Sequence, residues 1–180
     1  LRNKKDKKIG VLNIDAHFDL RPYPEGPRSG SGFLQIADYQ RLQGQSFHYM
    51  AVGIQEASNT KALFETAQKL DAKYILSEDC RPWNIKKLIT EVTAFIDSVD
   101  YVYCSVDLDV FSAHLAPGVS ATALNGIHPD CMLELFPLLA QSKKLISLDI
   151  AELNPDFDVD NRTGKLAAYL TYKLINLLTS

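Results

Sequence analysis

Short apolar runs alternate with longer amphipathic segments along this chain. Five runs are rich in apolar and β-branched residues and have the length of strands: 9–15, 47–54, 74–77, 101–110 and 145–153. The segments between and after them place apolar residues at helical spacing and predict helices over 33–42, 59–70, 83–99, 129–142 and 165–178. Within the fourth of these helices, Pro137 predicts a kink or an interruption.

The order of these elements predicts the fold class. Strands that alternate with helices are typical of an α/β fold with a mostly parallel sheet. The runs are apolar on both faces, as expected when helices cover both sides of the sheet in a three-layer α/β/α arrangement. No repeat, low-complexity tract or linker divides the 180 residues, so we expect 1–180 to form a single α/β domain.

Potential metal ligands follow two of the predicted strands directly. Asp15, His17 and Asp19 end the first run, and Asp107 and Asp109 end the fourth. Alternation along a strand places Asp15 and His17 on one side and gives Asp107 and Asp109 a shared side. If the two strands are neighbours, all five side chains converge, and carboxylates with one imidazole suit a divalent ion such as Mn²⁺. The pattern therefore predicts a two-metal hydrolytic centre.

Each motif taken alone also has a structural explanation. Asp109 could cap the following turn, Asp19 could form a surface ion pair with Arg21, and His17 could be a satisfied polar residue. The occurrence of both motifs at strand ends favours metal binding. The two longest irregular stretches, 21–32 and 111–126, follow the same two strands and are expected to be active-site loops.

The last predicted strand also carries acidic residues. Glu152 falls near its carboxyl end, where it could hold a cationic nitrogen of a substrate or, alternatively, pair with Arg162. We expect Asp149 to order the same strand end through hydrogen bonds to neighbouring backbone.

Composition limits the partners of the chain. A net charge of −3 gives no global attraction to nucleic acid or to an anionic membrane. No apolar stretch approaches the roughly 20 residues that span a bilayer, so we expect neither a membrane nor nucleic acid as partner. The predicted hydrolytic centre leads us to expect a small-molecule substrate. The three cysteines are widely spaced and predict neither a disulfide framework nor a zinc site, which favours the reducing cytoplasm.

A Mg²⁺-dependent phosphoryl-transfer enzyme is disfavoured because no glycine-rich phosphate loop is found.

Three segments together resemble the signatures of the ureohydrolase family of arginases, agmatinases and formimidoylglutamases. Residues 15–19 look like its Asp-Ala-His-x-Asp motif, residues 105–118 like its Ser-x-Asp-x-Asp…Pro-Gly motif, and residues 149–155 like its third motif. The resemblance covers almost the whole chain. It implies an arginase-like fold with the strand order 5-4-1-2-3.

The resemblance also implies a binuclear manganese centre with two Mn²⁺ ions in a complete site. Asp15 and Asp107 would bridge both ions, Asp19 would bind one, and His17 and Asp109 would bind the other. These roles are carried over from the family motifs residue by residue.

Within the family, residues 18–22 and 119–121 look most like those of formimidoylglutamases. These enzymes hydrolyse the C–N bond of N-formimidoyl-L-glutamate to L-glutamate and formamide during histidine degradation. The resemblance implies that Glu152 is catalytic and orients the amidine-like group of the substrate. Arg21 stands where arginases have a substrate-contacting asparagine and could clamp a substrate carboxylate, or pair with Asp19 or Glu25. Residues 26–33 lack the histidine of the arginase-type loop, which disfavours an arginase or agmatinase.

The family has a further N-terminal segment that includes a Gly-Gly-x-His motif, whose histidine binds one metal. The resemblance therefore implies that 1–180 is the C-terminal part of a ureohydrolase-like catalytic domain. We expect the chain as given to hold one metal poorly and to lack activity alone. The alternatives are another ureohydrolase that acts on a guanidino substrate, and a non-catalytic fragment.

An unpaired edge of the strand at 145–153 predicts a homo-oligomer or association through that edge.

Overall fold

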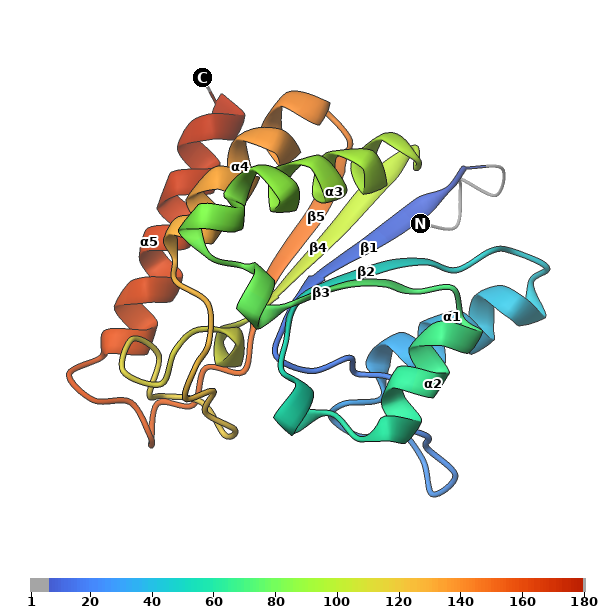
Figure 1. Ribbon diagram of the computed structural model, residues 1–180, viewed down its shortest axis with the longest axis horizontal. Coiled ribbons are helices and arrows are strands. Elements are labelled where there is room, and N and C mark those ends of the chain that lie inside the picture. The colour runs from blue at the N-terminus through green and yellow to red at the C-terminus, as the bar shows by residue number, and fades with distance from the viewer. Residues whose placement is uncertain (1–6, 180) are drawn as a thin grey trace.

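The computed structural model describes residues 7–179 and is built on a five-stranded sheet. The strand order is β3-β2-β1-β4-β5, and every neighbouring pair is parallel (Figure 1). This is the predicted order read from the opposite edge, so the predicted fold is confirmed. The strands are β1 (Ile9–Ile14), β2 (His48–Ile54), β3 (Lys73–Leu76), β4 (Tyr101–Asp107) and β5 (Leu145–Ala151).

Two groups of helices pack on opposite faces of this sheet because alternate residues of β1 serve two cores. Leu12 and Ile14 belong to the core beneath the last three helices of the chain, whereas Val11 belongs to the core beneath the first two. Figure 1 shows the two groups on either side of the sheet. The helices are α1 (Gly32–Leu42), α2 (Lys61–Lys69), α3 (Ile85–Asp97), α4 (Asp130–Ser142) and α5 (Arg162–Thr179).

The expected strand over 101–110 is too long, because β4 ends at Asp107. A short 3₁₀ turn, η4 (Leu108–Val110), follows it. The Asp107 carboxylate caps this turn by accepting a hydrogen bond from the Asp109 backbone N–H at 2.9 Å. Leu108 and Val110 are as buried in the turn as they would be in a strand, so hydrophobicity alone could not locate the strand end.

Pro137 does not interrupt α4, which is continuous from residue 130 to residue 142. The helix buries an apolar stripe on both sides of the proline, and this packing maintains the helix where intrinsic propensity would oppose it. The buried residues of that stripe are Cys131, Met132, Leu135, Phe136 and Leu139.

One face of β4 and β5 is less covered than the apolar pattern predicted. Ser147 is exposed and Asp149 is half-buried. The Asp149 carboxylate accepts hydrogen bonds from the Tyr103 hydroxyl and, at 2.8 Å, from the Ser105 hydroxyl. The expectation that Asp149 bonds to backbone is therefore wrong, since its partners are side chains of the neighbouring strand.

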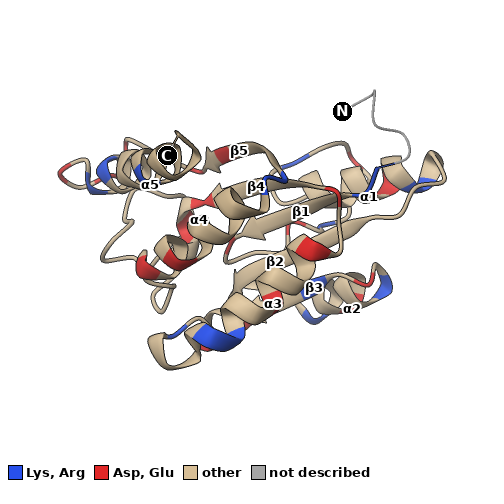
Figure 2. Ribbon diagram, turned by 90° about the horizontal axis from the view of Figure 1, so that it is seen from above, with Lys and Arg blue, Asp and Glu red and all other residues tan. Residues whose placement is uncertain are grey.

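The charged residues of the described chain do not gather on one helix or one strand. Figure 2 shows Lys and Arg spread over several helices and loops. None of the described helices combines the length and the apolar character needed to cross a membrane.

Candidate metal centre

The carboxyl ends of β1 and β4 lie side by side. Ile14 is in register with Val106, so the next residues, Asp15 and Asp107, leave the sheet next to each other. Their side chains are largely buried, with residue exposures of 2% and 7%. Buried carboxylates are costly unless a proton, a hydrogen-bond donor or a cation compensates their charge.

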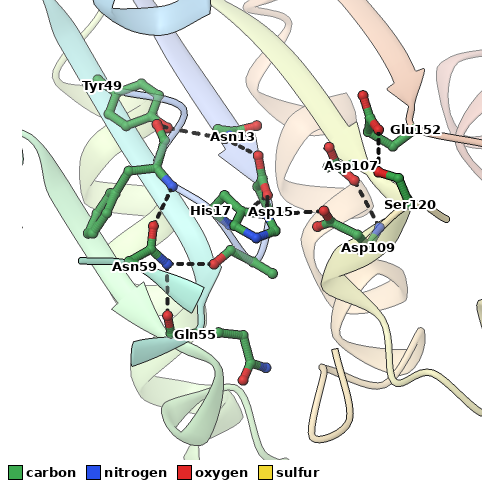
Figure 3. Close-up of polar contacts among 12 residues, drawn as sticks. Asn13, Asp15, His17, Tyr49, Gln55, Asn59, Asp107, Asp109, Ser120 and Glu152 are labelled. Atoms are coloured by element: carbon green, nitrogen blue, oxygen red, sulfur yellow. Dashed lines mark hydrogen bonds and ion pairs between the residues drawn. The ribbon is translucent and has the colours of Figure 1, made fainter. Parts of the chain in front are cut away.

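His17 lies between two of the acidic side chains. Its Nδ1 atom is 3.0 Å from Asp109 Oδ2 and 3.4 Å from Asp15 Oδ1 (Figure 3). Asp15, His17 and Asp109 each offer a ligand atom within 4.8 Å of the other two. Of the five residues that the strand-end motifs singled out, the structure brings these three into one ligand cluster.

Asp107 lies beside this cluster, with its carboxylate turned partly toward the backbone. It accepts the hydrogen bond that caps η4, and it neighbours the charges of Asp15 and Asp109. Asp109 lies in the η4 turn. The turn therefore positions it at the site, and not the strand alternation that the sequence suggested. Its Oδ1 atom is buried and has no hydrogen-bond partner among the described residues.

Asp19 reaches the same site from the beginning of the loop between β1 and α1. Its φ of 52° lies in the left-handed region, which is unfavourable for a residue with a side chain. Burial raises the pKa of its carboxyl, and the charges of His17, Asp109, Arg21 and Glu152 also act on it. These interactions indicate that Asp19 faces the cluster and the open side of the site.

The two candidate substrate-binding residues are exposed near the cluster. Glu152 has a φ of 64° and accepts a hydrogen bond from the Ser120 hydroxyl at 3.2 Å. The alternative partner of Glu152, Arg162, instead donates to the carbonyl of His114 at 2.7 Å.

Arg21 lies over Gly30, whose φ of 79° allows the backbone to approach the arginine side chain closely. Glu25, one alternative partner of Arg21, pairs with Arg28 instead. The Arg21 side chain is therefore not held by Glu25 and stays near the Asp19 carboxylate.

The electrostatics of the cluster favour a cation. Burial, followed by the charges of Asp109 and Asp19, raises the pKa of Asp15 to about 7. Burial, followed by the charges of Asp15 and Asp109, raises the pKa of Asp107 to about 9. Hydrogen bonds to Asp109 and Asp15 raise the pKa of His17 to about 10. The acidic groups thus retain protons because negative charge is crowded in a buried place.

The residues present fit a divalent metal ion. The donor set consists of carboxylate oxygens and one imidazole nitrogen, which are ligands for ions such as Mn²⁺. The unpartnered Oδ1 of Asp109 is a free acceptor beside the other ligand atoms. A divalent cation there would supply the positive charge that protons otherwise provide.

Sequence reasoning missed the polar residues that surround the ligands. Asn13 lies within the first apolar run, two residues before Asp15 and therefore on the same face of β1. A buried polar residue at that position was a signal that could have been read. Tyr49, Asn59 and Ser120 come from other parts of the chain, and nothing in their local sequence points to the site.

A sequence profile of the arginase family matches residues 1–176. The chain belongs to the arginase family. Among its relatives, the formimidoylglutamase of Vibrio cholerae serotype O1 is 43% identical over 180 residues, covering 97% of this chain and 54% of the relative. The formimidoylglutamase of Rhodococcus jostii is 43% identical over 169 residues, covering 94% of this chain and 52% of the relative.

Solved structures agree with this membership of the arginase family. The crystal structure of formimidoylglutamase from Bacillus subtilis has a TM-score of 0.85 and 27% identity, covering 95% of this chain and 53% of that one. The Entamoeba histolytica arginase in complex with L-ornithine has a TM-score of 0.79 and 24% identity, covering 96% of this chain and 61% of that one, and this likeness shows the fold alone. The chain thus spans about half the length of the curated relatives that it matches.

Proposed function

We propose that a protein carrying this chain is a manganese-dependent formimidoylglutamase, which hydrolyses N-formimidoyl-L-glutamate to L-glutamate and formamide. The observation that carries the proposal is the cluster of Asp15, His17 and Asp109 at the carboxyl end of the sheet. The relatives named formimidoylglutamase, which are 43% identical, support the choice of substrate within the arginase family.

Five side chains of this site would hold a binuclear Mn²⁺ centre: Asp15, His17, Asp19, Asp107 and Asp109. When bound, divalent ions lower the pKa of water toward neutrality and stabilise negative charge that develops in the reaction. The chain itself contributes orientation. The Glu152 carboxylate accepts hydrogen bonds from the amidine-like nitrogens of the substrate, and Ser120 limits the directions in which that carboxylate points.

Arg21 supplies the second substrate contact in this proposal. Its guanidinium is exposed, lies beside the Asp19 carboxylate and can bind a carboxylate with two parallel hydrogen bonds. N-formimidoyl-L-glutamate carries two carboxylates, whereas the guanidino substrate agmatine carries none. A clamp of this kind therefore favours the glutamate derivative.

The test is a parallel assay of formamide and urea release in the presence of Mn²⁺. A protein carrying this chain should release formamide from N-formimidoyl-L-glutamate and no urea from agmatine or L-arginine. The variant Arg21→Gln should lose activity on the first substrate, mainly through a higher KM, while the exposed control Arg41→Gln should not. Urea release without formamide release would make the guanidino alternative correct.

We also propose that 1–180 forms part of one catalytic domain, that the protein is cytoplasmic, and that it is a homo-oligomer or associates through the outer edge of β5. The support for association is the position of β5 at the end of the sheet and the exposure of apolar residues nearby. Ile146 on β5 is 39% exposed, and Tyr172 on α5 is 62% exposed. Exposed strand edges and apolar patches favour contact with another chain.

A further inference from the structure

The loop that carries the first three proposed ligands is fastened by buried polar side chains from β1, β2 and the segment just before α2. We propose that Asn59, Tyr49 and Asn13 are positioning residues, which hold this loop in the geometry that presents its ligands to the metal. The inference rests on the proposed function. It assigns to these three residues a role in metal affinity that is separate from any role in stability.

Asn59 binds the backbone of the ligand loop at two points. Its Oδ1 accepts a hydrogen bond from the Phe18 N–H at 3.1 Å, and its Nδ2 donates to the Ala16 carbonyl at 2.8 Å (Figure 3). The same Nδ2 donates to the Gln55 carbonyl at 2.7 Å. Asn59 is 7% exposed, and both ends of its amide are therefore used inside the protein.

Tyr49 and Asn13 support the loop from the sheet. The Tyr49 hydroxyl donates to the Phe18 carbonyl at 2.7 Å and accepts a hydrogen bond from Asn13 Nδ2 at 3.1 Å. Asn13 Nδ2 also donates to Asp15 Oδ2 at 2.9 Å. The other Asp15 oxygen, Oδ1, accepts the His17 backbone N–H at 2.6 Å. Asn13 thus fixes the rotation of a proposed ligand directly.

The contacts follow a pattern along the loop. The residues that would bind metal are at positions 15, 17 and 19, whereas Asn59 and Tyr49 hold the backbone of positions 16 and 18. The Phe18 ring is fully buried and packs edge-on against Phe64 and Tyr74. The loop is therefore anchored on its non-ligand side.

Such anchoring is what a metal loop requires. Ligands must be held close to their productive geometry before the ion binds, because otherwise binding must also order them. Loss of a residue that hydrogen-bonds to a metal ligand typically weakens metal affinity by about 10- to 100-fold. The left-handed backbone at Asp19 adds to this requirement, since a strained conformation persists only when its surroundings determine it.

The decisive variant is Tyr49→Phe, which removes one hydroxyl and retains the ring. The matched control is Tyr103→Phe, which removes a hydroxyl that donates to Asp149 and has no described hydrogen bond to the ligand loop. Titration with Mn²⁺, followed by electron paramagnetic resonance, should show about 10- to 100-fold weaker binding for Tyr49→Phe and unchanged binding for Tyr103→Phe. Equal affinities for the two variants, with a lower melting temperature for Tyr49→Phe, would assign Tyr49 a purely structural role and overturn the inference.

A second measurement separates this inference from the proposed function. Amide hydrogen exchange without metal should be faster at Phe18 in Asn59→Leu and Tyr49→Phe than in the unaltered protein, and unchanged in Tyr103→Phe. If the unaltered protein bound no Mn²⁺, the proposed function would fail, whereas faster exchange at Phe18 in the variants would still show that Asn59 and Tyr49 order the loop, which is the basis of the positioning role. Unchanged exchange at Phe18 in both variants would refute it.

Discussion

Asp109 illustrates how a single residue at this site takes part in opposing charge interactions. Asp109 is 4% exposed, one of its carboxylate oxygens has no partner among the described residues, and two further carboxylates lie close by. We therefore expect Asp109→Asn to weaken Mn²⁺ affinity by at least the roughly 10- to 100-fold that residues hydrogen-bonded to metal ligands are worth. Loss of the 3.0 Å ion pair with His17 and relief of the repulsion between carboxylates act on the metal-free protein in opposite directions, so its free energy of unfolding should change little. Mn²⁺ titration and urea unfolding measure the two effects.

The control for this variant is Asp71→Asn, because Asp71 is an exposed residue paired only with Lys73 among the ion pairs described. Asp71→Asn should change neither the Mn²⁺ affinity nor the free energy of unfolding by a measurable amount. Loss of stability in Asp109→Asn with unchanged metal affinity would show that Asp109 supports the turn and does not bind metal.

The ionisable residues of the candidate site predict an unusual pH dependence of the stability of the metal-free protein. The pKa is raised to about 7 for Asp15, to about 9 for Asp107 and to about 10 for His17. These groups therefore bind more protons in the folded metal-free protein than in the unfolded chain. Stability falls with rising pH wherever the folded state binds more protons, so metal-free stability should decrease between about pH 6 and 9.

Metal binding should show the opposite trend over the same range. The ligands must lose their protons before they bind a cation, so Mn²⁺ affinity should rise with pH and each binding event should release protons. Urea unfolding with and without Mn²⁺ at several pH values measures both trends. A metal-free stability that increases over this range would contradict the raised pKa values.

The elements show where sequence reasoning succeeds. β1 and β2 stand out as apolar runs and the helices between the strands as amphipathic segments. Their alternation predicted the parallel sheet, whereas the strand order came from the family resemblance. β4 was extended beyond Asp107 because Leu108 and Val110 are buried in either conformation. The capping hydrogen bond from the Asp109 N–H to the Asp107 carboxylate decides between strand and turn, and hydrophobicity does not reveal it.

At the candidate site, too, the sequence pattern locates some residues and not others. The strand-end residues Asp15 and Asp107 could be placed from the sequence, because neighbouring parallel strands present their carboxyl ends at one edge. The side chains that hold the ligand loop, such as Asn59, act through contacts between residues distant in sequence. Such contacts carry no local pattern, so only the structure reveals them.

One contact between elements links the loop after β4 to α5. The Thr163 side chain, fully buried in the first turn of α5, accepts a hydrogen bond from the Gly118 N–H at 2.7 Å. Thr163→Val keeps the shape but leaves that donor without a partner, which should lower the free energy of unfolding by about 1–3 kcal/mol. Urea denaturation measures the loss, and Thr163→Ser, which keeps the hydroxyl, should lose less. A larger loss in Thr163→Ser than in Thr163→Val would show that the methyl packing contributes more than the hydrogen bond.

The whole molecule presents an apolar flank around β5 and α5. β5 is the last strand of the sheet, no described strand pairs with its outer edge, and the exposed face of α5 includes Tyr169, Tyr172 and Ile175. Apolar side chains at a strand edge favour pairing with another chain, whereas a lysine there opposes it.

The outer edge of β5 therefore predicts concentration-dependent self-association that depends on the side chain at position 146. Sedimentation velocity over a range of concentrations should show assembly of the unaltered protein, and Ile146→Lys should shift the equilibrium toward smaller species. Leu124→Lys is the matched control, because Leu124 is 90% exposed and lies on the loop between β4 and α4. If both lysine variants changed assembly equally, general charge repulsion would explain the effect, and the edge of β5 would not be the contact surface.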